Sequence, residues 1–307
     1  MKLEKSEVIW FDGEFVPWDD ARVHVLSHAL HYASAAFEGL RAYATPRGPA
    51  IVQLGRHVKR LFRTCKVIQL PLPFTPEQIR QAILDTVVRS GHPGCYIRPL
   101  VFRGYGELGI DPSRCPVRVA IATWPHGSHF GDAVRENGLS LGISSWRRMA
   151  QDTHPAMAKA VGNYLNSQLI MLEAKRHGYA DGIALDAEGY PCETSGGNLF
   201  LVYDGRLYTP PLHGAVLPGV TRGCAITLAE ELGHPVREER VAREMLLGAE
   251  EVFVSGTAAE ITPVTAIDGQ PVGDGKMGPI TRRIQREFFS LVRGEAEDRH
   301  GWLTVCG

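Results

Sequence analysis

The lysines of this chain are few, and one of them stands apart. Only seven of the 33 basic residues are lysine. Six of these lie in charged or glycine-rich stretches: Lys2, Lys5, Lys59, Lys66, Lys175 and Lys276. Lys159 instead lies in Pro-Ala-Met-Ala-Lys-Ala-Val-Gly (155–162), with no acidic residue nearby in the sequence. A lysine removed from water is a nucleophile that readily forms a Schiff base. The alternative is a lysine at a helix start whose ammonium group stays in water.

Two turns of small residues have the composition of an anion site. The first, Leu-Pro-Gly-Val-Thr-Arg (217–222), leads into a predicted helix, where free backbone N–H groups attract phosphate. The second, Ser-Gly-Thr-Ala-Ala (255–259), follows a predicted strand and offers a hydroxyl and amides to a phosphate or a carboxylate. Taken alone, the first turn favours the alternative, an ordinary Pro-Gly turn with a threonine cap. Together with Lys159, the two turns indicate a phosphorylated aldehyde cofactor.

Polar residues on two further predicted strands could recognise charge. Tyr96 and Arg98 are two apart in the strand 95–103, so they share one face and could bind a carboxylate. The alternative for Arg98 is a surface ion pair. Glu193 ends a strand just before Thr-Ser-Gly-Gly (194–197), where its carboxylate could point inward or simply remain in water.

These residues need a framework of mixed strands and helices. Alternation and turn residues predict four hairpins, at 8–16, 40–54, 183–193 and 199–209, and single strands at 95–103, 117–124, 139–146 and 251–255. Apolar spacing and helix-end signals predict helices at 56–69, 75–89, 162–177, 221–232 and 278–293, and the alanine-rich segment 28–38 is expected to form a short buried helix. The interleaving lacks a regular βαβ rhythm, which favours an α+β fold.

Composition and charge narrow the class of protein. The length of 307 residues suggests about two domains, and the charged, glycine-containing segment 126–138 is the predicted boundary, between a domain at 1–125 and one at 139–307. The formal net charge of -1 provides no overall field for nucleic acid or an anionic membrane surface. Six well-separated cysteines, no metal-ligand spacing, no secretory leader and no membrane-length apolar run indicate a cytoplasmic protein with reduced thiols.

An ordered series of motifs resembles the branched-chain-amino-acid aminotransferases, pyridoxal-phosphate enzymes of fold type IV. The motifs span nearly the whole chain: WFDGEF (10–15), SHALHYASAAFEGLRAY (27–43), RHVKRLF (56–62), YIRPLVFRGYG (96–106), MAKAVGNYLNSQL (157–169), EAKRHGY (173–179), LPGVTR (217–222) and VFVSGTAAEITPV (252–264). The resemblance implies a small N-terminal and a larger C-terminal α/β domain. It also implies a homodimer at least, with a homohexamer as the larger alternative.

The resemblance carries roles onto individual residues. It implies that Lys159 is the catalytic lysine that binds pyridoxal 5′-phosphate, that Glu193 is the partner of the pyridine nitrogen, and that Tyr164 bonds the ring hydroxyl. The implied phosphate and ring contacts are Arg60, Leu217, Gly219, Val220, Thr221, Gly256 and Thr257. The implied substrate pocket comprises Tyr32, Phe37, Gly39, Tyr96, Arg98, His129, Ala258 and Ala259. The implied substrates are leucine, isoleucine and valine, with 2-oxoglutarate and glutamate as the acidic pair.

Two departures from the family pattern leave the substrate range open. Gly197 stands where relatives often have glutamate, and His129 stands where a pocket tyrosine is common in bacterial relatives. The nearest alternative is therefore another enzyme of the same fold, namely a D-amino-acid or (R)-amine transaminase or aminodeoxychorismate lyase. A non-catalytic cofactor-binding protein is an alternative from another class.

Overall fold

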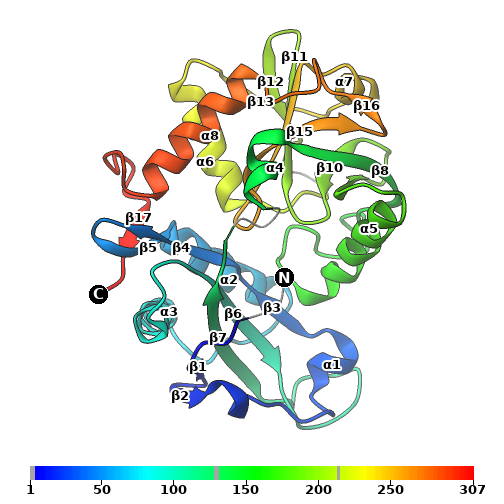
Figure 1. Ribbon diagram of the computed structural model, residues 1–307. Coiled ribbons are helices and arrows are strands. Elements are labelled where there is room, and N and C mark those ends of the chain that lie inside the picture. Colours follow the sequence, from blue (N-terminus) through cyan, green and yellow to red (C-terminus); the bar gives the residue numbers. More distant parts are fainter. Residues whose placement is uncertain (1–3, 128–130, 213–214) are drawn as a thin grey trace. The chain divides into compact units, whose positions relative to one another are not determined.

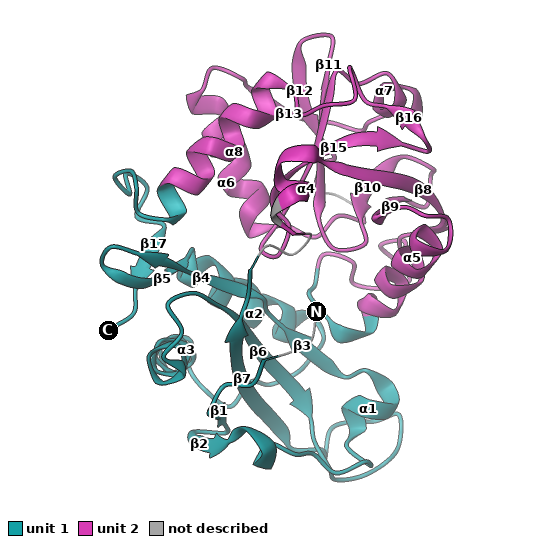
Figure 2. Ribbon diagram, viewed as in Figure 1, with its two compact units in different colours: residues 1–127, 158–162, 291–307 teal, residues 128–157, 163–290 magenta. Residues whose placement is uncertain are grey.

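The computed structural model describes residues 4–127, 131–212 and 215–307, and the chain divides into two compact units (Figures 1 and 2). Unit 1 is residues 1–127, 158–162 and 291–307, and unit 2 is residues 128–157 and 163–290. The first change of unit falls inside the predicted interdomain loop 126–138, part of which is helical, at Asp132–Asn137. Because 158–162 and 291–307 belong to unit 1, neither unit is a continuous run of sequence. The domain limits 1–125 and 139–307 stay a prediction.

Unit 1 is built on one antiparallel sheet with two main helices. Its elements are β1 (Val8–Phe11), β2 (Glu14–Pro17), the 3-10 turn η1 (Trp18–Asp20), α1 (His28–Tyr32), β3 (Ala35–Phe37), β4 (Leu40–Thr45), β5 (Gly48–Val52), α2 (Leu54–Val67), α3 (Pro76–Ser90), β6 (Cys95–Arg103), β7 (Val117–Pro125) and β17 (Leu303–Val305). Among the described residues, eight strands form a sheet in the order β17-β5-β4-β6-β7-β1-β2, with β3 also paired to β6. All pairings within this sheet are antiparallel.

Alternation along β6 and β7 gives this sheet two different faces. Ile97, Val101 and Ile121 are fully buried and share one apolar core with side chains of α2 and α3. Successive side chains of a strand point to opposite faces, so Tyr96 and Arg98 lie on the other face. The helices therefore stabilise one side of the sheet, and the other side is available for polar and aromatic groups.

The predicted helix 75–89 is confirmed as α3, together with its cap. Thr75 Oγ1 accepts a hydrogen bond from the Gln78 backbone N–H at 3.2 Å, and Gln78 Oε1 accepts one from the Thr75 N–H at 2.8 Å. Pro76 occupies the first helical position, where its missing N–H costs nothing. Gly91 ends the helix in the left-handed conformation, at φ 66°.

The predicted buried helix at 28–38 is wrong in both extent and burial. Helix α1 ends at Tyr32 because Ala33 adopts the left-handed conformation, with φ 52°. The chain then becomes extended, and β3 pairs with β6 through Ala35↔Phe102 and Phe37↔Leu100. Local alanine-rich composition favoured a helix, but pairing with a neighbouring strand prevailed.

Unit 2 is built on a second sheet, which has both parallel and antiparallel pairings. Its elements are α4 (Asp132–Asn137), β8 (Leu139–Arg147), α5 (Tyr164–Arg176), β9 (Asp181–Leu185), β10 (Pro191–Thr194), β11 (Asn198–Tyr203), β12 (Arg206–Thr209), α6 (Val220–Glu231), β13 (Val236–Glu238), α7 (Arg243–Leu247), β14 (Glu251–Gly256), β15 (Glu260–Ile267) and β16 (Gln270–Pro271). The 3-10 turn η2 (Val161–Asn163) and α8 (Pro279–Val292) each include residues of both units. Within the described ranges, nine strands run in the order β10-β9-β8-β15-β14-β11-β12-β13, with β16 on β15.

The predicted hairpins and long helices of unit 2 are confirmed, whereas several elements escaped the sequence analysis. These are β13, α7, β15, β16 and α4. Strand β15 is buried along most of its length and lies between β8 and β14, so it lacks the apolar–polar alternation of a half-exposed strand.

None of the helices in the described part of the chain combines the length and apolar character needed to cross a bilayer.

Candidate active site

Lys159 is held against β3 and α2 by its own backbone groups, two residues before the 3-10 turn η2. The Phe37 N–H donates to the Lys159 carbonyl at 3.2 Å, and the Lys159 N–H donates to Thr64 Oγ1 at 3.0 Å. A β-bridge joins the neighbouring residues Ala36 and Ala160. These contacts fix the backbone on both sides of the lysine and place its Nζ 4.8 Å from the centroid of the Phe37 ring.

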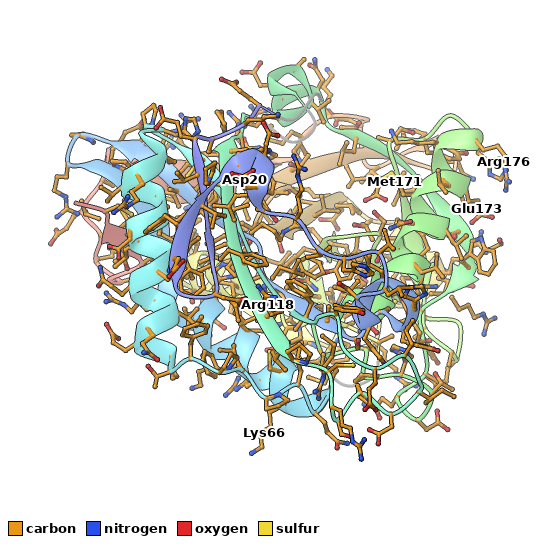
Figure 3. The ribbon with its side chains drawn as sticks, turned by 90° about the horizontal axis from the view of Figure 1, so that it is seen from below. Asp20, Lys66, Arg118, Met171, Glu173 and Arg176 are labelled. Atoms are coloured by element: carbon orange, nitrogen blue, oxygen red, sulfur yellow. The ribbon has the colours of Figure 1, made fainter. Side chains whose placement is uncertain are left out.

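The setting of Lys159 differs from that of the charged side chains on helix surfaces. Lys66 on α2 and Arg176 on α5 are exposed, and both project away from the ribbon (Figure 3). Lys159 is partly buried and lies against an aromatic ring. Lys159, which the sequence analysis separated from the six lysines in charged or glycine-rich stretches, therefore also has a less exposed and more aromatic environment.

Arg60 belongs to a buried group of three charged or titratable side chains. Glu38 accepts hydrogen bonds from Arg60 Nε at 2.6 Å and Arg60 Nη2 at 2.9 Å, and it lies 2.8 Å from His57 Nδ1. Burial alone would raise the pKa of Glu38, but the Arg60 charge, His57 and their hydrogen bonds outweigh it and hold that pKa far below its ordinary value. Burial lowers the pKa of His57, although Glu38 opposes the shift. The group therefore contains an ionised carboxylate, a guanidinium and a neutral imidazole.

Tyr96, Arg98, Phe37 and Gly39 are brought together on the sheet face opposite the core. The Arg98 guanidinium carbon lies 4.7 Å from the Phe37 ring centroid and 5.4 Å from that of Tyr96. A Cβ atom at Gly39 would fall 1.9 Å from the Tyr96 hydroxyl oxygen. Only glycine at this position lets the tyrosine hydroxyl lie directly over the β3–β4 connection.

Tyr32, in contrast, has a different environment. It ends α1, where its ring packs on His28 at 4.6 Å and 48% of the residue remains exposed. Its predicted role in the substrate pocket therefore remains a proposal.

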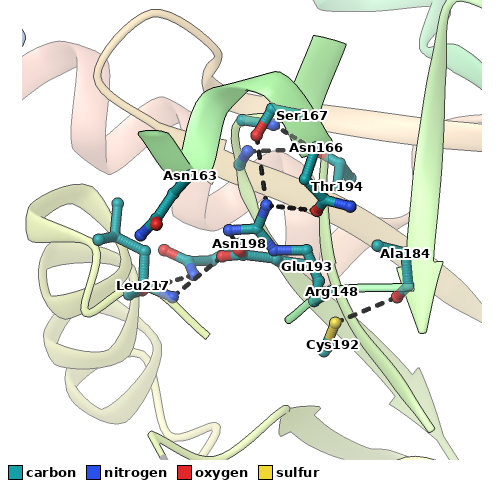
Figure 4. Close-up of polar contacts among 12 residues, drawn as sticks. Arg148, Asn163, Asn166, Ser167, Ala184, Cys192, Glu193, Thr194, Asn198 and Leu217 are labelled. Carbon is teal, nitrogen blue, oxygen red and sulfur yellow. Dashed lines mark hydrogen bonds and ion pairs between the residues drawn. The ribbon is translucent and has the colours of Figure 1, made fainter. Parts of the chain in front are cut away.

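Glu193 on β10 is a buried carboxylate with two firm partners. Its Oε1 lies 2.7 Å from Arg148 Nη2, and its Oε2 accepts from the Leu217 N–H at 3.1 Å (Figure 4). Glu193 and Arg148 are 5% and 7% exposed. Since the arginine stabilises the anionic form and the backbone N–H fixes its direction, this carboxylate can hold a buried cationic N–H group.

A row of residues across three strands connects Glu193 to both small-residue turns. Glu193 pairs with Asn198 on β11, and Asn198 pairs with Ser255 on β14. The Asn198 side chain donates to the Leu217 carbonyl at 2.9 Å (Figure 4), and a Cβ atom at Gly219 would fall 2.0 Å from Asn198 Oδ1. The turns 217–222 and 255–259 are thus joined through one asparagine.

The other predicted residues of unit 2 lie on these same turns or at one helix start. Val220 and Thr221 open α6, which has no acidic residue in its first turn and no side-chain cap. Gly256 ends β14, and Thr257, Ala258 and Ala259 form the turn before β15. Tyr164 is the first residue of α5. His129 lies outside the described residues.

Sequence reasoning missed the side chains that support these groups. They are Glu38, His57, Arg148 and Asn198. The available signal was weak: Glu38 lies within the motif FEGLR (37–41), and Arg148 ends an arginine pair after a strand. Gly197 closes a tight turn, in which its N–H donates to Thr194 Oγ1 at 3.0 Å, and a Cβ there would lie 3.2 Å from the Ser255 carbonyl.

The groups in unit 2 fit a phosphorylated pyridine cofactor. Ser255 Oγ is fully buried and has no hydrogen-bond partner among the described residues, so this turn contains a donor that a bound group would satisfy. The uncapped N-terminus of α6 favours an anion, and the Glu193 carboxylate favours a protonated ring nitrogen.

Comparisons with known proteins show similarity to aminotransferases over nearly the whole chain. The family described as amino-transferase class IV matches residues 35–267. The branched-chain-amino-acid aminotransferase of Escherichia coli (strain K12) is 47% identical over 304 residues, covering 99% of this chain and 98% of that protein. A crystal structure of the E. coli enzyme has a TM-score of 0.96 at 47% identity and covers 99% of this chain and 100% of its own.

A branched-chain amino acid aminotransferase from T.th. is also similar over its full length. Its structure with pyridoxamine 5′-phosphate has a TM-score of 0.95 at 43% identity and covers 99% of each chain. Further structures of that enzyme hold N-(5′-phosphopyridoxyl)-L-glutamate and 4-methylvaleric acid. The chain described here belongs to the class IV aminotransferase family and, within it, to the branched-chain-amino-acid aminotransferases.

Proposed function

We propose that this protein moves the amino group of L-leucine, L-isoleucine or L-valine to 2-oxoglutarate in two half-reactions, giving a branched-chain 2-oxo acid and L-glutamate. The observation that carries this proposal is the Phe37 ring, whose centroid lies 4.8 Å from the Lys159 amine and 4.7 Å from the Arg98 guanidinium carbon. An amine suited to transamination and a guanidinium suited to a carboxylate thus share one aromatic side chain. Full-length similarity to branched-chain-amino-acid aminotransferases supports the same substrate class.

The cofactor is pyridoxal 5′-phosphate, whose conjugated ring takes up the electrons left when the substrate loses its Cα proton. We assign Lys159 as the residue that binds its aldehyde carbon and Tyr164 as the donor to its ring hydroxyl. The residues assigned to its phosphate and ring faces are Arg60, Leu217, Gly219, Val220, Thr221, Gly256 and Thr257. The uncapped start of α6 and the unsatisfied Ser255 hydroxyl support the phosphate assignment.

Two residues would do the proton chemistry. Glu193, kept anionic by Arg148 at 2.7 Å, holds a proton on the pyridine nitrogen. The Lys159 amine, released when the substrate amine replaces it, removes the proton from the substrate Cα and returns it to the cofactor carbon as a general acid–base catalyst. In the second half-reaction the same residue moves the proton in the opposite direction.

The substrate pocket must accept two kinds of side chain. Phe37 and Tyr96 offer aromatic surface to a branched aliphatic side chain, and Arg98 offers a cation to the distal carboxylate of glutamate. We also assign Tyr32, Gly39, His129, Ala258 and Ala259 to this pocket, from the family resemblance. The T.th. enzyme binds a glutamate adduct and 4-methylvaleric acid in separate structures, which supports a pocket of this dual kind.

We further propose that the protein is a homodimer or a larger homo-oligomer in the cytoplasm. Unit 1 exposes large apolar side chains in two segments, which a β-bridge between Ser27 and Tyr105 joins: Val23, Val25, Leu26, Leu30, Tyr32, Tyr105, Leu108 and Ile110. Burying this surface against a second copy would remove it from water. Replacing Ile110, which is 88% exposed, by glutamate should shift the sedimentation coefficient toward that of a monomer.

An absorbance titration of the purified holoprotein tests the proposed activity. L-leucine, D-alanine and (R)-1-phenylethylamine are added separately, and the visible band of bound pyridoxal phosphate is followed as it converts to the pyridoxamine form. We expect rapid conversion by L-leucine only. Conversion chiefly by D-alanine or by the amine would assign the protein to another transaminase of the same fold. A protein that never binds the cofactor would not be an enzyme of this class.

A further inference from the structure

Trp124 completes an aromatic group on the substrate-binding face of unit 1. It lies on β7 directly opposite Tyr96 of β6, and the two rings stack with centroids 5.0 Å apart and an interplanar angle of 29°. The residue opposite Arg98 is Ala122, whose small side chain leaves room for the guanidinium. Cross-strand partners lie on the same face of a sheet, so the indole, the phenol and the guanidinium are immediate neighbours.

The guanidinium of Arg98 lies among three rings. Its carbon is 4.7 Å from the centroid of Phe37, 5.4 Å from that of Tyr96 and 5.8 Å from that of Trp124. Its buried Nε has no hydrogen-bond partner in the described part of the chain. The face of each ring is a region of negative potential. The three rings therefore offset part of the free-energy cost of removing this guanidinium from water.

This arrangement suits a pocket that must accept both an acidic and an aliphatic side chain. The planar N–H groups of a guanidinium can hydrogen-bond a carboxylate while its faces remain against aromatic rings. When a leucine side chain is bound instead, the rings still stabilise the Arg98 charge. Without the rings, an apolar substrate would leave this partly buried charge without a favourable partner.

We propose that Trp124 is a positioning residue that sets the preference of this pocket between acidic and branched aliphatic side chains, by holding Tyr96 and the Arg98 guanidinium in place. The proposal rests on the proposed function, because it assumes that Arg98 meets the distal carboxylate of glutamate. Trp124 acts through Arg98 and takes no part in the proton transfer.

Two non-reacting acids test the proposal by binding to the holoenzyme. Glutarate is glutamate without its amino group, and 4-methylvalerate is leucine without its amino group. In calorimetric titrations, Trp124→Leu should weaken glutarate binding about fivefold, as expected for loss of one cation–π contact together with its stacked support. Binding of 4-methylvalerate should change less than about twofold. Its aliphatic chain has no distal carboxylate, so it makes no contact with the Arg98 charge that the substitution could weaken. Trp124→Phe, which keeps a ring, should restore most of the glutarate affinity.

A double-mutant cycle separates positioning from a general structural effect. In an Arg98→Leu background, Trp124→Leu should leave glutarate affinity unchanged, because the group through which it acts is absent. Trp146→Leu, at a tryptophan that is 46% exposed on β8, is the matched control and should alter neither affinity. Trp124→Met provides a second ring-free variant if Trp124→Leu does not fold.

Single-turnover half-reactions show which proposal fails. If wild-type holoenzyme is converted by neither L-leucine nor L-glutamate, the proposed function is wrong. If both amino acids convert it, but ring-free variants lose glutarate and 4-methylvalerate affinity equally, or lose neither, Trp124 has no role in selection. A loss of glutarate affinity that persists undiminished in the Arg98→Leu background would likewise overturn the proposal.

Discussion

Unit 1 buries the Glu38 carboxylate against Arg60, and unit 2 buries the Glu193 carboxylate against Arg148. Both pairs have short contacts, of 2.6 Å and 2.7 Å, and all four residues are less than 9% exposed. Each carboxylate accepts a backbone N–H, Glu38 from Gly39 at 3.2 Å and Glu193 from Leu217 at 3.1 Å. Glu38 differs in that it also contacts the His57 ring at 2.8 Å, a group that can titrate.

The difference shows two ways of keeping a buried carboxylate ionised. In unit 1, an arginine, a histidine and the Gly39 backbone N–H hold the carboxylate, and the proposed functional member is the arginine, with Glu38 as its support. In unit 2, an arginine and the backbone hold the carboxylate, and the proposed functional member is Glu193, with Arg148 as its support. The same ion pair can therefore present a positive group in one unit and a negative group in the other. We expect sensitivity to pH near neutrality to arise in the first.

The largest effect should come from a change that leaves both ion pairs intact. Lys159→Ala removes the amine that moves the Cα proton, and we expect turnover of L-leucine with 2-oxoglutarate to fall about 10⁴-fold. Lys66→Ala, at an exposed lysine on α2 (Figure 3), should leave turnover unchanged. A Lys159→Ala variant with a rate close to that of the wild type would show that the assignment is wrong.

Glu193→Gln tests the negative member of the unit 2 pair. Glutamine keeps the shape and a hydrogen-bond acceptor but loses the charge that holds a proton on the ring nitrogen. We expect the L-leucine half-reaction to slow about 10²-fold while the cofactor stays bound, a magnitude typical of losing one preorganised electrostatic contact. Stopped-flow absorbance measures the rate directly. An unchanged rate would remove Glu193 from this role.

Glu38→Gln makes the matching change in unit 1 and should act mainly on stability. It leaves the buried Arg60 guanidinium without its counter-charge, and we expect the free energy of unfolding to fall by about 3 kcal/mol. Molecules that retain the cofactor should react at close to the wild-type rate. Denaturant unfolding gives the first quantity and single-turnover rates the second. A rate loss equal to that of Glu193→Gln would contradict the distinction between the pairs.

The proposed functional members of these pairs could be named from the sequence, but the residues that support them could not. Arg60 lies in the motif RHVKRLF (56–62), Glu193 is assigned by the family resemblance at a predicted strand end, and Lys159 is distinguished by the lack of charged neighbours in its segment. Glu38 and Arg148 approach their partners only through folding, across 22 and 45 residues of chain, so no local spacing indicates the contact. Trp124 is likewise set beside Tyr96 by strand register, across residues distant in sequence.

The difference between local signals and contacts distant in sequence also explains which predicted elements were right and which were wrong. Strand β6 and helix α3 follow local alternation and capping, and their bounds agree with the prediction to within one residue. Segment 28–38 has a helical composition, but its last part forms β3 because β6 supplies hydrogen-bond partners. Tertiary partners overrode local preference there.

Gly39→Ala should give a smaller effect on unit 1, confined to substrate binding. The new Cβ atom would lie 1.9 Å from the Tyr96 hydroxyl, so the ring must move away from its place beside Arg98. We expect KM for L-glutamate to rise about tenfold, a loss typical of one misplaced hydrogen-bonding group, with cofactor affinity unchanged. Gly55→Ala in α2, where a Cβ meets nothing within 4 Å, is the control and should leave KM unchanged. An unaltered KM in Gly39→Ala would mean that the Tyr96 hydroxyl has no role in binding.

The smallest effect concerns pH and tests whether sensitivity near neutrality belongs to unit 1. Burial lowers the pKa of His57 in the folded protein below its ordinary 6.5, against the opposing charge of Glu38. As the pH falls below 6.5, the unfolded chain therefore takes up a proton at this histidine that the folded chain does not. The free energy of unfolding should decrease by up to about 1.4 kcal/mol per pH unit until the folded pKa is reached. The lowered pKa of Glu38 adds a further loss of stability below about pH 4.5.

His57→Gln removes the titrating ring but keeps a donor for Glu38. Its unfolding free energy should therefore change less than that of the wild type as the pH is lowered from 6.5 toward about 5, while the loss below pH 4.5 persists. His31→Gln, at an exposed histidine of α1, should follow the wild-type curve. Because the two curves are subtracted, groups that titrate alike in both proteins cancel. A difference curve that is flat over this range would show that His57 does not make the unit 1 pair sensitive to pH.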